Sequence, residues 1–119
     1  MDAEDRRKIE KIAADRKHAH QQLLAKGSGV YKAFLDMEKA AYAAGRLDKV
    51  QKELIALGIS VVINCESCME WHLHQALLGG ASEAQVLEAV GVGIEMGGGP
   101  ATVSARFALK ALEYHSGGK

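Results

Sequence analysis

The chain has 119 residues and a formal net charge of zero, with 48% apolar and 25% charged residues. This length predicts a single domain with one modest core. The balanced charge excludes the strongly basic surface typical of nucleic-acid-binding proteins, and no basic block indicates binding to a membrane surface. The longest apolar run, residues 54–63, is roughly half the length of a membrane-spanning helix. We therefore expect a soluble, cytoplasmic protein with no nucleic-acid or membrane partner.

Apolar residues recur at helical spacing along the whole chain, and glycines separate the segments. This pattern predicts an all-α fold, a compact bundle of five or six helices in a single domain of residues 1–119. The first helix is predicted from about Asp2 to Leu24, and its apolar stripe is thin. We interpret residues 1–26 as an N-terminal helical extension that either frays or packs on another subunit.

The second helix is predicted from about Ser28 to Ala44 and the third from about Asp48 to Ile63. The inner face of the second helix would carry Tyr31, Phe34, Leu35, Glu38, Ala41 and Tyr42. The third helix is apolar nearly all round after Glu53, so we expect it at the centre of the core.

The last three helices have recognisable first residues. The fourth is predicted to start near Cys65, with Asn64 as its N-cap, and to end at Gly79. The fifth starts at the capping-box residue Ser82 and would bury Val86, Leu87, Val90 and Ile94. The sixth starts near Pro100 after a triple glycine, and its inner stripe would contain Val103, Phe107, Ala111 and Tyr114.

The stretch NCESCMEWHLH, residues 64–74, holds the only two cysteines of the chain. Cys65, Cys68 and His72 lie at positions i, i+3 and i+7, so a helix would align them along one narrow stripe. In a reducing cytosol such a pair indicates catalysis or metal binding more often than a structural disulfide. A helix N-terminus and a neighbouring imidazole both favour the thiolate, which is the nucleophilic form. The stretch thus supplies an attacking thiol, a base and a second thiol.

Glu53 precedes ten uncharged residues in a helix that we expect to be buried. A buried carboxylate is costly unless it has a partner. Because the third and fourth helices are joined by a short connection, they should be antiparallel neighbours, and Glu53 would then face His72. A carboxylate that orients an imidazole completes the logic of a catalytic triad. The simpler interpretation is an ordinary helix carboxylate near Lys49 or Lys52.

Two other interpretations of the cysteines stay open at this point. The thiols could be inert and buried, or they could bind zinc together with His72 and either Glu53 or His74. His74 lies about 200° round the helix from His72, so we expect it to face solvent or an interface. Three further histidines stand in polar surroundings and carry no signal of function: His18, His20 and His115.

The segment from Lys52 to Val90 resembles the core of the alkylhydroperoxidase D-like proteins, within the carboxymuconolactone decarboxylase superfamily. The family pattern has a glutamate that opens an apolar helix, then Cys-x-x-Cys-x-x-x-His, an alanine, a Gly-Ala turn and an acidic helix start. The corresponding residues here are Glu53, Cys65, Cys68, His72, Ala76, Gly80–Ala81 and Glu83–Glu88.

The resemblance implies an alkylhydroperoxidase D-like fold that assembles into homo-oligomers: dimers, trimers or hexamers. It implies a peroxidase or disulfide oxidoreductase that needs no metal or other cofactor and acts on a hydroperoxide or a disulfide. Cys68 would be the attacking thiol, His72 and Glu53 its proton relay, and Cys65 the resolving thiol. A lipoyl group or a thioredoxin-like protein would be the dithiol reductant.

Two features of the sequence bear on how far the resemblance extends. Ser67 stands where the better-studied peroxidases of the family often carry a histidine, and a serine is no base at neutral pH. Decarboxylase members generally lack the cysteine pair, so its presence argues against decarboxylation. The alternatives are a carboxymuconolactone decarboxylase-like enzyme and a metal-binding or redox-switch oligomer.

Overall fold

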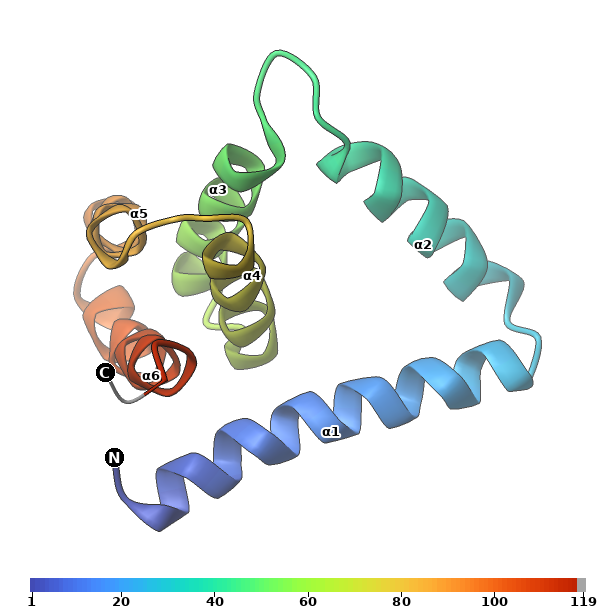
Figure 1. Cartoon of the computed structure of the whole chain (residues 1–119), viewed down its shortest axis with the longest axis horizontal. Helices are drawn as coiled ribbons and strands as arrows, with labels where there is room; N and C mark the ends of the chain where they lie inside the picture. The colour runs from blue at the N-terminus through green and yellow to red at the C-terminus, as the bar shows by residue number, and fades with distance from the viewer. Residues whose placement is uncertain (118–119) are drawn as a thin grey trace.

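Six helices and no strand make up residues 1–117, the part of the chain that the computed structural model describes (Figure 1). The helices are α1 (Ala3–Ala25), α2 (Gly29–Tyr42), α3 (Lys49–Val62), α4 (Glu66–Leu78), α5 (Glu83–Gly97) and α6 (Gly99–His115). The prediction of an all-α fold with five or six helices is therefore confirmed. The end of the predicted domain, residues 118–119, lies outside the described residues.

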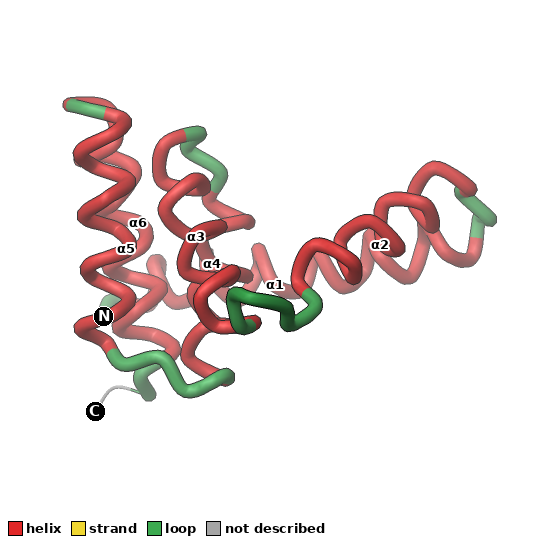
Figure 2. Tube along the Cα trace, turned by 90° about the horizontal axis from the view of Figure 1, so that it is seen from above, coloured by secondary structure: helices red, strands yellow, loops and turns green. Residues whose placement is uncertain are grey.

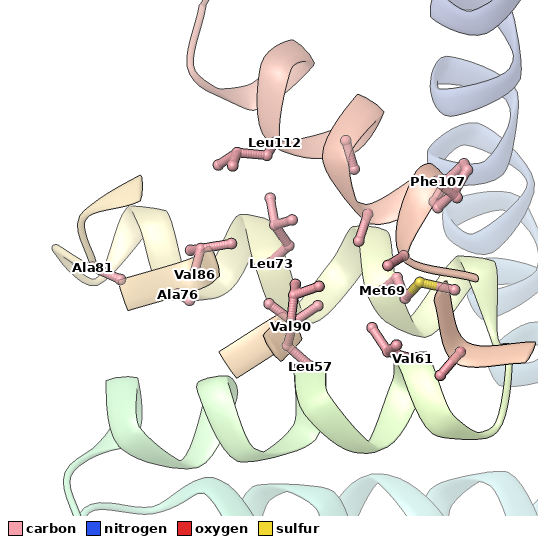
Figure 3. Packing of buried hydrophobic residues seen from close by; sticks show 14 of the residues in the cluster. Leu57, Val61, Met69, Leu73, Ala76, Ala81, Val86, Val90, Phe107 and Leu112 are labelled. Carbon is pink, nitrogen blue, oxygen red and sulfur yellow. The ribbon is translucent and has the colours of Figure 1, made fainter. Parts of the chain in front are cut away.

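The hydrophobic core lies between α3, α4, α5 and α6 (Figure 3). Each of these helices presents one apolar face to the others, as the helical spacing predicts. The largest fully buried apolar side chains of these four helices are Leu57, Val61, Met69, Leu73 and Val86. By contrast, α1 and α2 extend from the core as an open arm (Figure 2).

The first half of α1 is attached to the core. Ile9 is 1% exposed and is part of the core cluster. Around it, Lys8 donates to Glu66 of α4 at 3.0 Å, and Lys110 of α6 donates to Asp5 at 3.0 Å. These contacts fix the direction in which α1 leaves the core. Among residues 1–117, no helix combines the length and the apolar character that crossing a bilayer requires.

The predicted core faces of four helices differ from the structure. On α3, Ile55 and Ile59 are 51% and 55% exposed, because only one side of the helix packs against α4 and α5. No residue of α2 is buried, and Phe34 is 48% exposed. On the two last helices, Leu87 and Val103 also face outward. The expectation that α3 is surrounded by the core is thus wrong for the single chain.

The connection between α3 and α4 also differs from the prediction. Asn64 is not the N-cap of α4, because Cys65 takes that position and the helix begins at Glu66. Asn64 instead adopts a left-handed conformation with φ of 54°, which asparagine tolerates better than most residues. Its side-chain oxygen accepts a hydrogen bond from the Ser104 hydroxyl at 2.9 Å. This contact holds the turn against α6 and positions the start of α4.

Candidate functional site

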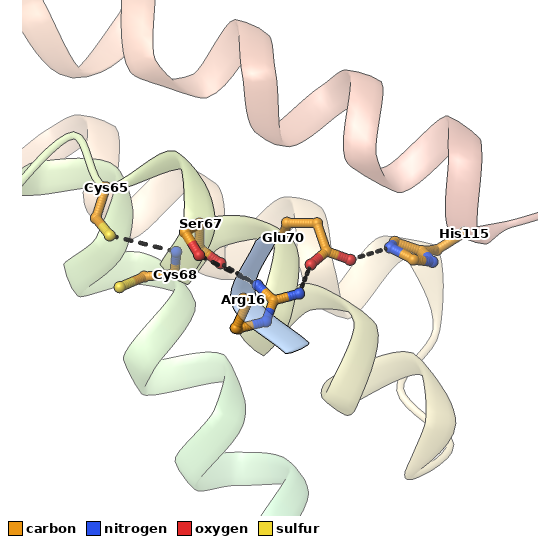
Figure 4. Close-up of polar contacts among 6 residues, drawn as sticks. All are labelled: Arg16, Cys65, Ser67, Cys68, Glu70 and His115. Carbon is orange, nitrogen blue, oxygen red and sulfur yellow. Dashed lines mark hydrogen bonds and ion pairs between the residues drawn. The ribbon is translucent and has the colours of Figure 1, made fainter. Parts of the chain in front are cut away.

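The two cysteines lie in the first turn of α4, and both are free and partly buried. The Cys65 sulfur accepts a hydrogen bond from the backbone N–H of Cys68 at 3.3 Å. Figure 4 shows both sulfurs on the same side of this turn. The side chain of Cys65 is therefore the N-cap of the helix, a position usually taken by Ser, Thr, Asp or Asn.

The ionisation of Cys68 differs from the prediction that its surroundings favour the thiolate. Burial, a hydrogen bond with Cys65 and the charge of Cys65 raise the pKa of the Cys68 thiol to about 11, and Arg16 offsets part of this effect. The largest cause is burial, which disfavours the charged form of the thiol. Cys68 is thus a thiol at neutral pH and needs a base when it reacts.

Glu53 of α3 and His72 of α4 contact each other as the sequence predicts. The His72 Nδ1 lies 2.7 Å from the Glu53 Oε1, and Glu53 is 3% exposed. A carboxylate can only accept, so Nδ1 carries the proton, and Nε2 is the basic nitrogen of the neutral ring. The second carboxylate oxygen accepts from the Lys49 ammonium at 2.7 Å, so the simpler interpretation of Glu53 also holds.

Tyr42 is a residue of this site for which the sequence analysis gave no role. Its ring stacks on His72 with the centroids 5.3 Å apart. Burial raises the pKa of the Tyr42 hydroxyl, and the negative charges of Glu53, Glu38 and Cys68 raise it further. The helical spacing predicted that Tyr42 lies on the inner face of its helix, but no motif in the sequence indicated that this face contacts His72.

A second polar cluster lies on the other side of α4, around the buried carboxylate of Glu70. Arg16 of α1 forms an ion pair with one oxygen of Glu70, and His115 of α6 lies 2.6 Å from the other (Figure 4). Burial alone would raise the pKa of Glu70, but the hydrogen bonds of His115 and Arg16 keep it below its ordinary value. The sequence analysis assigned no role to His115, and the structure shows that it is a partner of this buried carboxylate.

His74 belongs to this second cluster and not to the thiol site. Its ring stacks on His115 with the centroids 3.9 Å apart and the planes 10° apart, and the side chain is partly exposed. Burial and the neighbouring His115 lower the pKa of His74. Consequently His74 cannot complete the predicted zinc site with Cys65 and Cys68.

Glu70, His74 and His115 are the one set of possible metal ligands found together within residues 1–117, with ligand atoms within 4.8 Å of one another. The arrangement does not fit a metal ion. Ring nitrogens coordinate in the plane of the imidazole, and two parallel stacked planes do not meet at one ion. Both carboxylate oxygens of Glu70 are also occupied, by Arg16 and by His115.

Comparison with known proteins identifies the family and the relatives to which this sequence is similar. The sequence model of the Carboxymuconolactone decarboxylase family matches residues 28–111. A Paracoccus denitrificans protein, "Uncharacterized protein 4 in cox locus", is 39% identical over 87 residues, which cover 73% of this chain and 78% of that protein. An uncharacterized protein of Cupriavidus necator is 43% identical over 82 residues, which cover 69% of this chain and 70% of that protein.

Two solved structures have the same arrangement of helices. The apo structure of a carboxymuconolactone decarboxylase family protein from Legionella pneumophila superposes with a TM-score of 0.87 at 31% identity, covering 92% of this chain and 97% of that one. A Thermotoga maritima protein of the same family superposes with a TM-score of 0.79 at 30% identity, covering 87% of this chain and 88% of that one. The Thermotoga protein is described with a suggested part in an antioxidative response.

Proposed function

The chain belongs to the carboxymuconolactone decarboxylase family, and from this premise we propose that it is a thiol-dependent peroxidase or disulfide oxidoreductase. The observation that carries the proposal is the contact of 2.7 Å between Glu53 of α3 and His72 of α4, the helix whose start bears two free cysteines. A carboxylate-oriented imidazole one helical turn from a protonated thiol is the arrangement that general-base activation requires. The suggested antioxidative part of the Thermotoga protein agrees with this chemistry.

In the first step, Nε2 of His72 accepts the proton of the Cys68 thiol as the sulfur attacks the terminal oxygen of a hydroperoxide. The O–O bond breaks, the alcohol leaves with a proton returned from the imidazole, and Cys68 becomes a sulfenic acid. Glu53 stabilises the imidazolium that forms between these two proton transfers. The raised pKa of Cys68 is the reason that this step needs the base.

In the second step, the Cys65 sulfur attacks the sulfenic acid of Cys68. Water leaves, and a Cys65–Cys68 disulfide remains. An external dithiol, such as a lipoyl group or a thioredoxin-like protein, then transfers two electrons to this disulfide and becomes oxidised. A partner disulfide can replace the hydroperoxide, in which case the first product is a mixed disulfide at Cys68.

The test is to count free thiols before and after one equivalent of cumene hydroperoxide, with metal analysis on the same sample. We expect the wild type to lose both of its two thiols and to contain no stoichiometric metal. Cys65→Ser should stop at a sulfenic acid that dimedone traps, and Cys68→Ser should consume no peroxide. His72→Gln should slow thiol loss by about 10²–10⁴-fold, the usual range for general-base catalysis.

Two outcomes would contradict the proposal. Full peroxide consumption by Cys68→Ser would remove the assigned nucleophile. Decarboxylation of a lactone acid at an equal rate by the wild type and the Cys65→Ser/Cys68→Ser double variant would place the chemistry outside the thiol pair.

A further inference from the structure

Arg16 connects the N-terminal helix to the turn that bears the thiols. One nitrogen of its guanidinium donates to the carbonyl oxygen of Ser67 at 3.1 Å and to the Ser67 hydroxyl at 3.2 Å. The other terminal nitrogen forms the ion pair with Glu70, and the group lies 5.0 Å from the centre of the Trp71 ring. Since Ser67 immediately precedes Cys68, this guanidinium is fixed next to the backbone of the proposed nucleophile (Figure 4).

The charges around the thiol pair are mostly negative or already paired. From the neighbouring helices, Arg16 of α1 and Tyr42 of α2 interact electrostatically with Cys68, and Glu53 of α3 contacts His72. On α4 itself, Glu66 is paired with Lys8, and Glu70 lies on the other side of the helix with Arg16 and His115. Lys49 is bound to Glu53 and Lys8 to Glu66. Arg16 is the cation that lowers the pKa of Cys68, and it also neutralises the buried carboxylate two residues further along α4.

We propose that Arg16 is a positioning residue of the thiol site, through which the N-terminal helix fixes the first turn of α4 and offsets the negative charge that forms there during reaction. Arg16 lies outside residues 28–111, the range that the family model matches, so α1 adds this cation to the family core. The guanidinium acts through Ser67 and Glu70 and touches no reacting atom in this arrangement. His115, which is also outside that range, holds the other oxygen of Glu70 and keeps the carboxylate in place.

Arg16 is bound to the residue that precedes a partly buried thiol. A positive charge in this position favours the ionised form of the thiol, because the partly buried surroundings screen the charge weakly. Removing the charge also leaves Glu70 with His115 as its remaining partner, so the negative charge of this carboxylate is less well neutralised, which acts in the opposite direction. The two effects add, so the loss of Arg16 should have a larger effect than one distant surface charge would.

The experiment measures the rate of iodoacetamide alkylation of Cys68 against pH in a Cys65→Ser background, which leaves a single titrating thiol. We expect Arg16→Met to move the alkylation profile to higher pH by about one unit, which is about a tenfold lower rate at a fixed pH below the pKa. Arg16→Lys keeps the positive charge and loses the planar fork of the guanidinium, so its profile should lie between those of the parent and of Arg16→Met.

Lys8→Met is the matched control, because it removes another contact between α1 and α4 that is exposed and does not reach Ser67 or Glu70. Its profile should superimpose on that of the parent. An equal shift for Lys8→Met and Arg16→Met would overturn the proposal, since docking of α1 would then be the cause. An unchanged profile for a folded Arg16→Met protein would overturn it too.

Glu70→Gln provides a test of opposite sign, which decides the matter if Arg16→Met does not fold. It removes the anion that Arg16 neutralises and leaves the two hydrogen bonds of the guanidinium to Ser67, so more of the positive charge acts on this turn and the profile should move to lower pH. A shift to higher pH would overturn the proposal. The inference rests on the proposed function only for the effect of Arg16 on turnover, because the alkylation rate measures the ionisation of Cys68 without any peroxide. A protein with the expected profiles but no peroxidase activity would refute the proposed function alone.

Discussion

At the scale of single residues, the sequence predicts the partner of one buried carboxylate, Glu53, and does not predict the partners of the other, Glu70. Glu53 could be predicted, because ten uncharged residues follow it and a histidine comes one connection later. Glu70 could not be, because its partners Arg16 and His115 lie 54 and 45 residues away along the chain. A local pattern shows that a carboxylate needs a partner, but only the packing of α1 and α6 on α4 supplies these two.

His74 leads to a prediction about pH. Burial and the neighbouring His115 lower its pKa in the folded chain, so the unfolded chain binds a proton more readily as the pH falls through about 6.5. The free energy of unfolding should therefore decrease between pH 7.5 and pH 5.5, and the decrease should be smaller in His74→Gln. Urea titrations at several pH values measure it, and the contribution of His74 to the slope is at most about one proton per chain.

His18→Gln is the control for this measurement, since His18 is exposed on α1. The dependence of its free energy of unfolding on pH should match that of the wild type. An equally reduced dependence in His18→Gln and His74→Gln would contradict the assignment to His74. Glu70 does not interfere in this range. Its lowered pKa means that its contribution is present above the ordinary carboxyl range and is lost only at more acidic pH.

At the scale of helices, the signals that act over three or four residues predicted the structure well. The capping box of Ser82 and Gln85 is present, the six helices begin within a few residues of their predicted starts, and the first four also end within a few residues of their predicted ends. The predictions failed where a contact with a distant helix determines the local conformation. Asn64 bonds to Ser104 of α6 and takes a left-handed conformation, so the cap moves to Cys65.

The crossing of α3 and α5 leads to a prediction about stability. A Cβ atom at Gly93 would lie 2.7 Å from the Gly58 carbonyl oxygen and 3.1 Å from the Val61 Cβ. Since both neighbours are helix backbone or core atoms, Gly93→Ala should destabilise the protein by about 1–3 kcal/mol, as overpacking usually does. Urea denaturation at fixed protein concentration measures the change.

Gly91 offers a matched control on the same helix, because a Cβ atom there would meet nothing within 4 Å. Gly91→Ala should stabilise the protein by about 0.5–1 kcal/mol through helix propensity alone. If both substitutions stabilised the protein equally, the close approach of α3 and α5 would not exist in solution.

At the scale of the whole molecule, the chain exposes more surface than its mass requires. Its accessible area is 7566 Å², against about 6,200 Å² for a compact monomer of 12.7 kDa. Its radius of gyration is 14.7 Å, against about 13.5 Å for a compact chain of this length. The excess area of about 1,300 Å² exceeds the roughly 800 Å² that one partner buries in a standard interface.

The open arm carries this excess, and we propose that a second copy of the chain covers it. Exposed apolar residues at helical spacing line α2 and the facing side of α3: Val30, Phe34, Met37, Ile55 and Ile59. A groove of about 220 Å³ between these helices is lined by Tyr42, Ile55 and Ile59, among others. The sequence predicted α3 to be buried on all sides, which the single chain does not achieve and an oligomer would.

Light scattering after size-exclusion chromatography tests this proposal. We expect the wild type to have at least twice the mass of one chain and Ile59→Asp to have a lower mass. Leu78→Asp, which changes an exposed apolar residue outside the groove, should keep the mass of the wild type. A monomeric wild type at micromolar concentration would contradict the proposal.

The cap of α4 makes Cys65 part of the helix start as well as of the thiol pair. Its sulfur is the acceptor for the Cys68 N–H, an amide that has no partner within the helix. Under the proposed function, any step that turns this sulfur away from the amide would free the start of α4, so the chemistry of Cys65 and the order of this helix end would be coupled.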